Sequence, residues 1–312
     1  MLPSASSMPL PTPLRGIVTP LLTPLSAPGT VDEPALDKLI DHVIAGGVHG
    51  IFILGTTGEG PALGLDAMRR CIARAGAAVR GRVPLLVGIT HAAFDDAILL
   101  AQAAEAAGAA AVVTAGPCYF PVAQPELVAW CQRLAAASPL PVFLYNMPSH
   151  THVQFSEASV VELARVPKIV GLKDSSGHVQ YLHNLLRAVV KSGVRPDFTL
   201  MIGPEELMAE AVLLGVHGGV NGGSNLFPKL YVDLYHAAAA GNVEQIRALH
   251  DRVIDLSRRL YSVGTYGSSY LCGIKCAAAE LGLIQNILAA PYAPFAGVER
   301  ERIAAHVATL RG

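Results

Sequence analysis

The chain has 312 residues, a formal net charge of -1 and a hydrophobic fraction of 52%. This length fits two average domains or a single α/β barrel, and the near-neutral charge leaves no electrostatic footprint for nucleic acid or an anionic membrane. An uncharged stretch at 106–125 is interrupted by glycines and prolines, which make it a poor membrane span. We therefore expect a small-molecule partner, with no nucleic acid and no membrane.

The five cysteines show neither the CxxC spacing of a zinc site nor that of a disulfide framework. Cys272 and Cys276 share one helix face, which is commoner for buried thiols than for half of a soft metal site. We expect reduced cysteines, no metal and a cytoplasmic location. Residues 1–13, MLPSASSMPLPTP, lack the basic and apolar regions of a signal peptide and are predicted to form a mobile tail.

Short apolar runs alternate with Ala-rich helical patterns along most of the chain. The runs lie near 17–19, 51–54, 85–89, 111–114, 142–145, 169–173, 199–202 and 219–221, and the helical patterns include 34–45, 66–79, 95–107 and 125–136. Eight buried strands that alternate with helices favour a closed (β/α)8 TIM barrel over an open doubly wound sheet. The Gly-rich run 213–223 is then the eighth strand at the floor of a pocket, and not a phosphate-binding loop.

The barrel is predicted to span residues 14–236. Helical patterns at 243–260, 268–281 and 298–310 then form a C-terminal appendage, 237–312, packed on the barrel, because no Pro, Gly or Ser-rich linker separates them. Lys275, within the second of these helices, is expected at the surface or at an interface.

Polar side chains follow five of the predicted strands. In a (β/α)8 barrel the active site lies at the carboxyl ends of the strands and in the loops that follow them. The polar residues at these positions are Thr56, Thr57, Glu59, Tyr119, Tyr145, Lys173 and the segment 203–206.

Lys173 ends an apolar strand, where a charged ammonium is costly unless it is paired or neutral. An enclosed, mostly neutral barrel mouth disfavours the charged form and frees the amine to attack carbonyls. The loop 55–60, GTTGEG, offers backbone N–H groups and two hydroxyls as a cradle for a carboxylate. Tyr145 could pass a proton while hydrogen-bonded to Thr56. Together these residues predict imine chemistry on a 2-keto acid.

Three motifs carry a resemblance to a known family: GTTGE at 55–59, YNMP at 145–148 and GLKD at 171–174. In this order they resemble the dihydrodipicolinate synthase and N-acetylneuraminate lyase superfamily of pyruvate-dependent class I aldolases and dehydratases. The resemblance runs from about Leu14 through the C-terminal helices.

The resemblance implies a role for each matching residue. Lys173 is the Schiff-base lysine, so that no cofactor is needed, Tyr145 shuttles protons, Thr56 relays them and Thr57 holds the keto-acid carboxylate. Tyr119 matches a tyrosine that crosses a tight dimer interface into the partner's site, which implies a homotetramer built as a dimer of dimers. The remaining expected substrate-binding positions are Gly55, Ser175, Gly203, Val220, His150, Glu205 and Glu206.

Two departures bear on the substrate. His150 stands where dihydrodipicolinate synthases carry an arginine that clamps the second substrate's carboxylate, and a neutral imidazole cannot form that bidentate contact. Glu205 and Glu206 match an acidic pair that binds sugar hydroxyls in sialic acid lyases. Alternatively, both begin the helix after the seventh strand, where carboxylates favour the helix dipole.

Three functions remain open at this point. The first is a Schiff-base lyase, an aldolase or dehydratase, that acts on a hydroxylated 2-keto-3-deoxy acid with pyruvate as product or donor. The second is a 4-hydroxy-tetrahydrodipicolinate synthase, which condenses pyruvate with aspartate semialdehyde. The third is a non-catalytic barrel that binds keto acids.

Overall fold

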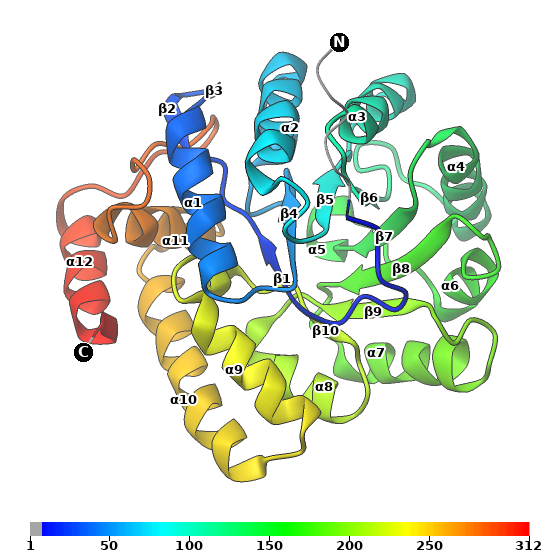
Figure 1. Cartoon of the computed structure of the whole chain (residues 1–312). Helices are drawn as coiled ribbons and strands as arrows, with labels where there is room; N and C mark the ends of the chain where they lie inside the picture. Colours follow the sequence, from blue (N-terminus) through cyan, green and yellow to red (C-terminus); the bar gives the residue numbers. More distant parts are fainter. Residues whose placement is uncertain (1–7, 312) are drawn as a thin grey trace.

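Parallel strands close into a barrel in the computed structural model, which describes residues 8–311 (Figure 1). The strands are neighbours in the order β1 (Gly16–Pro20), β4 (Gly50–Ile53), β5 (Leu85–Gly88), β6 (Ala111–Ala115), β7 (Val142–Asn146), β8 (Ile169–Asp174), β9 (Thr199–Ile202) and β10 (Gly218–Gly219), which returns to β1. The predicted barrel is confirmed. Of the predicted tail, residues 1–7 lie outside the described residues, and Leu10 packs against the apolar side chains inside the barrel.

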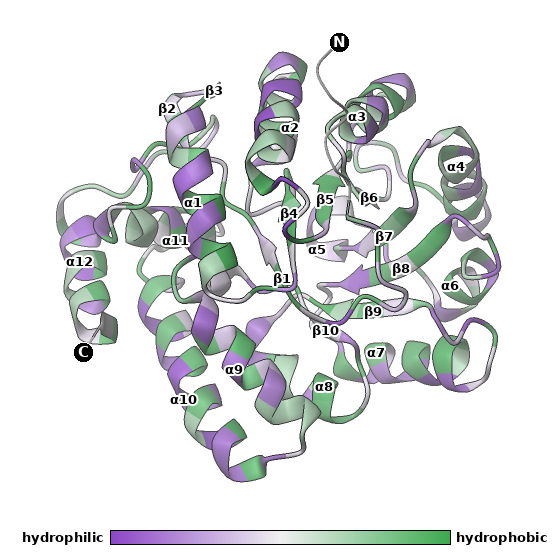
Figure 2. Ribbon diagram, viewed as in Figure 1, coloured by the Kyte–Doolittle hydropathy of each residue, from purple (hydrophilic) through white to green (hydrophobic). Residues whose placement is uncertain are grey.

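One helix follows each barrel strand and covers its outer face. These helices are α1 (Glu33–Ala45), α2 (Leu65–Val79), α3 (Phe94–Ala106), α4 (Gln124–Ala137), α6 (Glu157–Leu163), α7 (Val179–Leu185), α8 (Met208–Leu213) and α9 (Pro228–Ala239). Shorter elements are α5 (Pro148–Thr151), a π-helical turn (Leu186–Lys191) and 3-10 turns at Gly60–Ala62, Glu205–Leu207 and Gly222–Asn225. Hydrophilic residues gather on the outward faces of helices such as α1 and α10, as amphipathic helices on an apolar barrel require (Figure 2).

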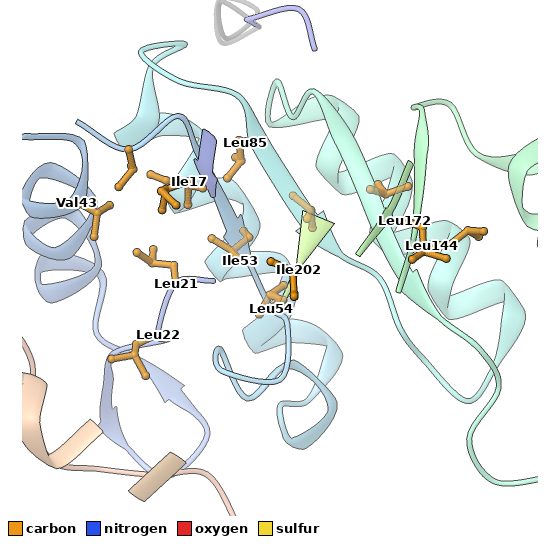
Figure 3. Packing of buried hydrophobic residues seen from close by; sticks show 14 of the residues in the cluster. Ile17, Leu21, Leu22, Val43, Ile53, Leu54, Leu85, Leu144, Leu172 and Ile202 are labelled. Atoms are coloured by element: carbon orange, nitrogen blue, oxygen red, sulfur yellow. The ribbon is translucent and has the colours of Figure 1, made fainter. Parts of the chain in front are cut away.

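Successive side chains of each strand point alternately inward and outward, which divides the core in two. On β7, Leu144 faces the helices, whereas Phe143 and Tyr145 face the barrel interior. Leu144 and Leu172 lie beside each other on the outer layer (Figure 3). The inner layer holds Phe52, Phe143 and their apolar neighbours beneath the mouth of the barrel.

Glycines allow the barrel to close at β10. Gly218 pairs with Gly16 of β1, and a Cβ atom on Gly218 would collide with the Gly16 carbonyl. The two backbones can approach this closely only because residue 218 has no side chain.

The sequence analysis missed a small hairpin between β1 and α1. Its strands β2 (Leu25–Ala27) and β3 (Thr30–Val31) are antiparallel and joined at Pro28 and Gly29, where Gly29 has a φ of 75°. The Pro-Gly pair is a turn signal, but strands this short leave no hydrophobic period to detect.

The C-terminal helices begin and end within one or two residues of their expected positions. They are α10 (Val243–Leu260), α11 (Ser269–Glu280) and α12 (Gly297–Arg311), and α10 packs beside α9 (Figure 1). Cys272 and Cys276 are buried in α11, as expected of helix-face thiols. Among the residues described, none of the helices combines the length and apolarity needed to span a bilayer.

Lys275 is fully buried inside the chain, so the expected position at the surface or at an interface is wrong. Its ammonium forms an ion pair with Glu59, a buried residue of the loop after β4 whose φ of 56° is left-handed. The Glu59 carboxylate also accepts a hydrogen bond from the Ala289 backbone N–H at 2.7 Å. A lone lysine in an amphipathic pattern gives no hint of this partner, because Glu59 is distant in the sequence. The pair ties the 55–60 loop to the C-terminal helices.

Replacement of Lys275 by methionine should destabilise the protein severely, because it leaves the Glu59 carboxylate buried without a counter-charge. We expect a loss of about 3–5 kcal/mol in the free energy of unfolding, measured by urea denaturation. The double variant Glu59→Gln/Lys275→Met should lose clearly less, since no unpaired charge remains.

The matched control is Lys229→Met, which breaks the exposed Lys229–Asp233 pair on α9. Exposed pairs of this kind contribute less than about 1 kcal/mol. Equal losses for Lys275→Met and Lys229→Met, or strictly additive losses in the Glu59/Lys275 cycle, would contradict the assigned role of the buried pair.

Candidate active site

Lys173 lies inside the mouth of the barrel at the carboxyl end of β8, with 7% of its surface exposed. The register of β7 and β8 pairs it directly with Tyr145. Its Nζ atom is 4.1 Å from the centroid of the Tyr145 ring and 5.3 Å from that of Phe52. Because Leu172 faces the helices, alternation along the strand directs Lys173 inward. An otherwise apolar strand can therefore carry a lysine near its carboxyl end, because that side chain enters the mouth of the barrel.

Tyr145 lies between Lys173 and the loop after β4. Its hydroxyl is 3.3 Å from Thr56 Oγ1, and the ring of Phe52 meets the Tyr145 ring edge to face. Burial alone raises the pKa of Tyr145, but the charge of Lys173 and the hydrogen bond with Thr56 outweigh it and bring the pKa below its ordinary value. A phenol in this environment exchanges its proton more readily than one in water.

Asn146 and Asp174 fix the strand ends from the other side of the sheet. Asn146 Nδ2 donates to Asp174 Oδ1 at 2.8 Å, and Asp174 also accepts from the backbone N–H and the hydroxyl of Ser176, at 3.1 and 3.0 Å. Burial raises the pKa of Asp174 despite these hydrogen bonds. The polar residues that follow Tyr145 and Lys173 thus hold the two strand ends and the loop after β8 in place.

A cavity of about 640 Å³ opens above Lys173. Ten of the predicted site residues line it: Thr56, Thr57, Tyr145, His150, Lys173, Ser175, Gly203, Glu205, Glu206 and Val220. Among the described residues that line it, Lys173 is the one lysine and arginine is absent. Lys173 is therefore the one basic amine that the described lining offers to a substrate.

Two predicted residues lie elsewhere. Gly55 lines a smaller neighbouring cavity together with Phe52 and Leu54. Tyr119 lies in the loop between β6 and α4 and is 81% exposed, with its ring edge to face with that of Phe120. The two aromatic rings are uncovered in the single chain.

Gly203 and Val220 form the wall beside the lysine. A Cβ atom on Gly203 would collide with Ser175 Oγ, so a larger residue would push Ser175 out of its position. The backbone N–H of Val220 donates to the Ile202 carbonyl at 2.8 Å. Val220 also belongs to the apolar residues inside the barrel and lines the cavity.

Glu205 and Glu206 are both engaged by the protein itself. Glu205 is buried and accepts hydrogen bonds from the Gly223 N–H at 2.9 Å, from the Tyr231 hydroxyl at 2.5 Å and from the Tyr261 hydroxyl at 3.0 Å. Burial raises the pKa of Glu205 to about 7 despite these donors. Glu206 accepts a hydrogen bond from the Ser257 hydroxyl.

Sequence reasoning missed three tyrosines that line the cavity from the C-terminal segment: Tyr292, and the pair Tyr261 and Tyr270. The Tyr270 hydroxyl is 3.0 Å from Thr57 Oγ1, and the rings of the pair meet edge to face with centroids 4.8 Å apart. All three follow helix α10, beyond the eighth barrel unit, so strand-end reasoning could not find them.

His150 lies at the rim of the cavity on the short helix α5. Its Nδ1 atom is 3.0 Å from the Ser149 hydroxyl. Desolvation and the neighbouring His152 lower the pKa of His150, so the ring is neutral at pH 7. It adds no positive charge to the mouth.

Comparison with known proteins agrees with this geometry. The model of the dihydrodipicolinate synthetase family matches residues 13–310. The chain is 35% identical to the 4-hydroxy-tetrahydrodipicolinate synthase of Thiobacillus denitrificans, over 93% of this chain and 95% of that protein. It is 33% identical to the Escherichia coli protein named "Probable 2-dehydro-3-deoxy-D-pentonate aldolase YjhH", over 77% of this chain and 80% of that protein.

The fold comparison gives the same result. The structure of dihydrodipicolinate synthase from Bacteroides thetaiotaomicron has a TM-score of 0.92 and 44% sequence identity to this chain, covering 96% of this chain and 99% of that one. The superfamily predicted from the three motifs is thereby confirmed. The chain belongs to the dihydrodipicolinate synthetase family and is an enzyme of the class I aldolase type.

Proposed function

We propose that this enzyme is a Schiff-base lyase that cleaves or dehydrates a hydroxylated 2-keto acid, with pyruvate as the product in the aldolase case. The observation that carries the proposal is the enclosure of Lys173 against Tyr145 in a cavity with no second lysine or arginine among its described lining residues. A buried amine beside a proton-exchanging phenol is the pair that imine formation requires.

Imine formation uses the residues around Lys173. The amine attacks the C2 carbonyl of the keto acid, and Tyr145, hydrogen-bonded to Thr56, passes the protons that allow the carbinolamine to lose water. The Thr57 hydroxyl and the N–H groups of the 55–60 loop hold the carboxylate. No cofactor is required, because the protonated imine is itself the electron sink.

Cleavage follows from the same arrangement. Tyr145 removes the proton of the 4-hydroxyl, the C3–C4 bond breaks, and its electron pair enters the imine to give an enamine and an aldehyde. Protonation of the enamine at C3, followed by hydrolysis of the imine with one water, releases pyruvate and regenerates Lys173. In a dehydration, the enamine forms by loss of a C3 proton and expels a hydroxyl group instead.

The size and charge of the cavity support a longer, hydroxylated substrate. Cavities of roughly 300–1,000 Å³ bind drug-sized ligands, so a cavity of about 640 Å³ has room for several carbons beyond pyruvate. A second carboxylate would find no cation beyond Lys173 among the described lining residues and would be repelled by Glu206, whereas Glu205, whose pKa burial raises to about 7, is partly protonated at pH 7. Uncharged hydroxyl groups avoid that repulsion.

The second candidate is a 4-hydroxy-tetrahydrodipicolinate synthase. The names of the relatives at 35% and 44% identity support it. This function requires that the neutral His150 at the rim bind the carboxylate of aspartate semialdehyde in place of an arginine. A barrel that binds keto acids without covalent capture is the third alternative.

Tyr119 supports a further part of the proposal, a homotetramer arranged as a dimer of dimers. The exposed rings of Tyr119 and Phe120 are suited to cover by a second copy of the chain, in which Tyr119 would reach the partner's site.

Pyruvate should be captured on Lys173. After incubation with pyruvate and reduction with borohydride, peptide mass spectrometry should find the reduced pyruvyl adduct on the peptide that contains Lys173, and Lys173→Ala should abolish it. An adduct on another lysine, or none on folded protein, would refute the imine mechanism and favour the third alternative.

Tyr145→Phe should remove the proton shuttle and keep the ring against Lys173. We expect kcat to fall by roughly 10²–10⁴-fold, the usual contribution of general acid–base catalysis. The matched control is Tyr181→Phe, which removes a buried hydrogen bond to the Phe155 carbonyl between two residues that do not line the cavity, and should leave kcat unchanged. Similar kcat values for the two variants would exclude Tyr145 as the shuttle.

Substrate choice should separate the first two candidates. The wild type should release pyruvate from a 2-keto-3-deoxy sugar acid or a 4-hydroxy-2-oxo acid, with competitive inhibition by pyruvate, and should condense pyruvate with aspartate semialdehyde only in traces. His150→Arg should raise that condensation by about tenfold, since a bidentate ion pair replaces one neutral donor. Rapid condensation by the wild type, without cleavage of any hydroxylated keto acid, would establish the second candidate instead.

A further inference from the structure

A cluster of acidic and phenolic groups behind Thr57 takes no part in the mechanism above. It consists of Glu205, Tyr231, Tyr261 and Tyr270 and joins the loop after β9 to helices α9, α10 and α11. Glu205, Tyr261 and Tyr270 also line the cavity above Lys173. Buried polar groups at the wall of a site restrict how the neighbouring side chains can turn.

Tyr270 is the member of the cluster that reaches the predicted carboxylate cradle. Its hydroxyl is 3.0 Å from Thr57 Oγ1, and a Cβ atom on Gly222 would collide with that hydroxyl. The phenol is therefore wedged between the Gly222 backbone and Thr57. Its ring is held edge to face by Tyr261, whose own hydroxyl donates to Glu205 at 3.0 Å.

Glu205 anchors the far end of this arrangement. Its two carboxylate oxygens together accept from Tyr231, Tyr261 and the Gly223 N–H, so that rotation of Tyr261 would break its hydrogen bond to Glu205. Either hydroxyl of the Thr57–Tyr270 contact could be the donor, and we assign the donor role to the phenol because a phenol O–H is intrinsically more acidic than an aliphatic one. Burial raises the pKa of Tyr270, so its phenol stays protonated and has one proton to donate.

We propose that Tyr270 is a positioning residue for the keto-acid carboxylate: its phenol donates to Thr57 Oγ1 and so directs the Thr57 proton toward the substrate. Once Thr57 Oγ1 accepts from Tyr270, its own O–H is free to donate to the carboxylate. This inference rests on the proposed function, because it takes a 2-keto acid as the ligand. Tyr270, which lies outside the eight barrel units, would then contribute to the preference of the site for carboxylates over neutral carbonyl compounds.

The test compares pyruvate with methyl pyruvate, which has the same carbonyl but no carboxylate. Binding is measured by calorimetry in the Lys173→Ala protein, where no imine can form at position 173. Addition of Tyr270→Phe keeps the ring and its contact with Tyr261 and removes only the hydroxyl. We expect pyruvate affinity to fall about tenfold, the size of one hydrogen bond to a charged group, and methyl pyruvate affinity to change less than about twofold.

A double-mutant cycle separates positioning from general damage. In the Thr57→Val background Tyr270→Phe should have no further effect on pyruvate affinity, since no hydroxyl remains to be directed. Tyr181→Phe is the matched control and should leave both affinities unchanged, and melting curves establish that each variant folds.

Three results would overturn the proposal. These are equal losses for the two ligands, an undiminished effect of Tyr270→Phe in the Thr57→Val background, or no preference for pyruvate in protein that retains Tyr270. Borohydride capture of pyruvate at Lys173 is measured separately in the wild-type protein. Failure of the proposed imine chemistry is therefore distinguishable from failure of the role assigned to Tyr270.

Discussion

The register between β7 and β8 is the constraint on which the site depends. It pairs Tyr145 with Lys173 at adjacent strand ends, and the alternation of side chains directs both into the barrel. A shift of β8 by one residue would bring Leu172 inward and send Lys173 among the helices. The hydrogen bond from Asn146 to Asp174 holds the same two strand ends on the outer side. The chemistry of the mouth and the packing of the outer core therefore enforce one register.

The C-terminal helices complete the site, although they add no strand to the barrel. Lys275 of α11 neutralises Glu59, which fixes the loop that carries Thr56 and Thr57, and Tyr270 of the same helix contacts Thr57. Ala289, beyond α11, adds a backbone donor to Glu59. A segment that looks like an appendage in the sequence thus supports one wall of the cavity through an ion pair and a hydrogen bond.

Local patterns in the sequence predict the barrel well, because each strand and helix carries its own hydrophobic period. The eight strands, the three C-terminal helices and the position of Lys173 at a strand end all follow from such patterns. Lys275 and Tyr270 could not be placed in this way, since their partners Glu59 and Thr57 are more than two hundred residues away in sequence. The expectation of an exposed Lys275 failed for this reason. Short elements such as β2 and β3 failed because two or three residues show no period.

Charge in the cavity separates the two leading functions more sharply than overall similarity does. Relatives named as a synthase and as an aldolase are both similar to this chain over most of its length, so overall similarity leaves the second half of the proposed reaction open. That half depends on what the distal end of the substrate meets. The cavity offers it a neutral His150 at the rim and Glu205 and Glu206 on the wall, and the proposed imine would occupy Lys173. A second carboxylate would need a counter-charge from a group other than Lys173, whereas a hydroxylated chain needs none.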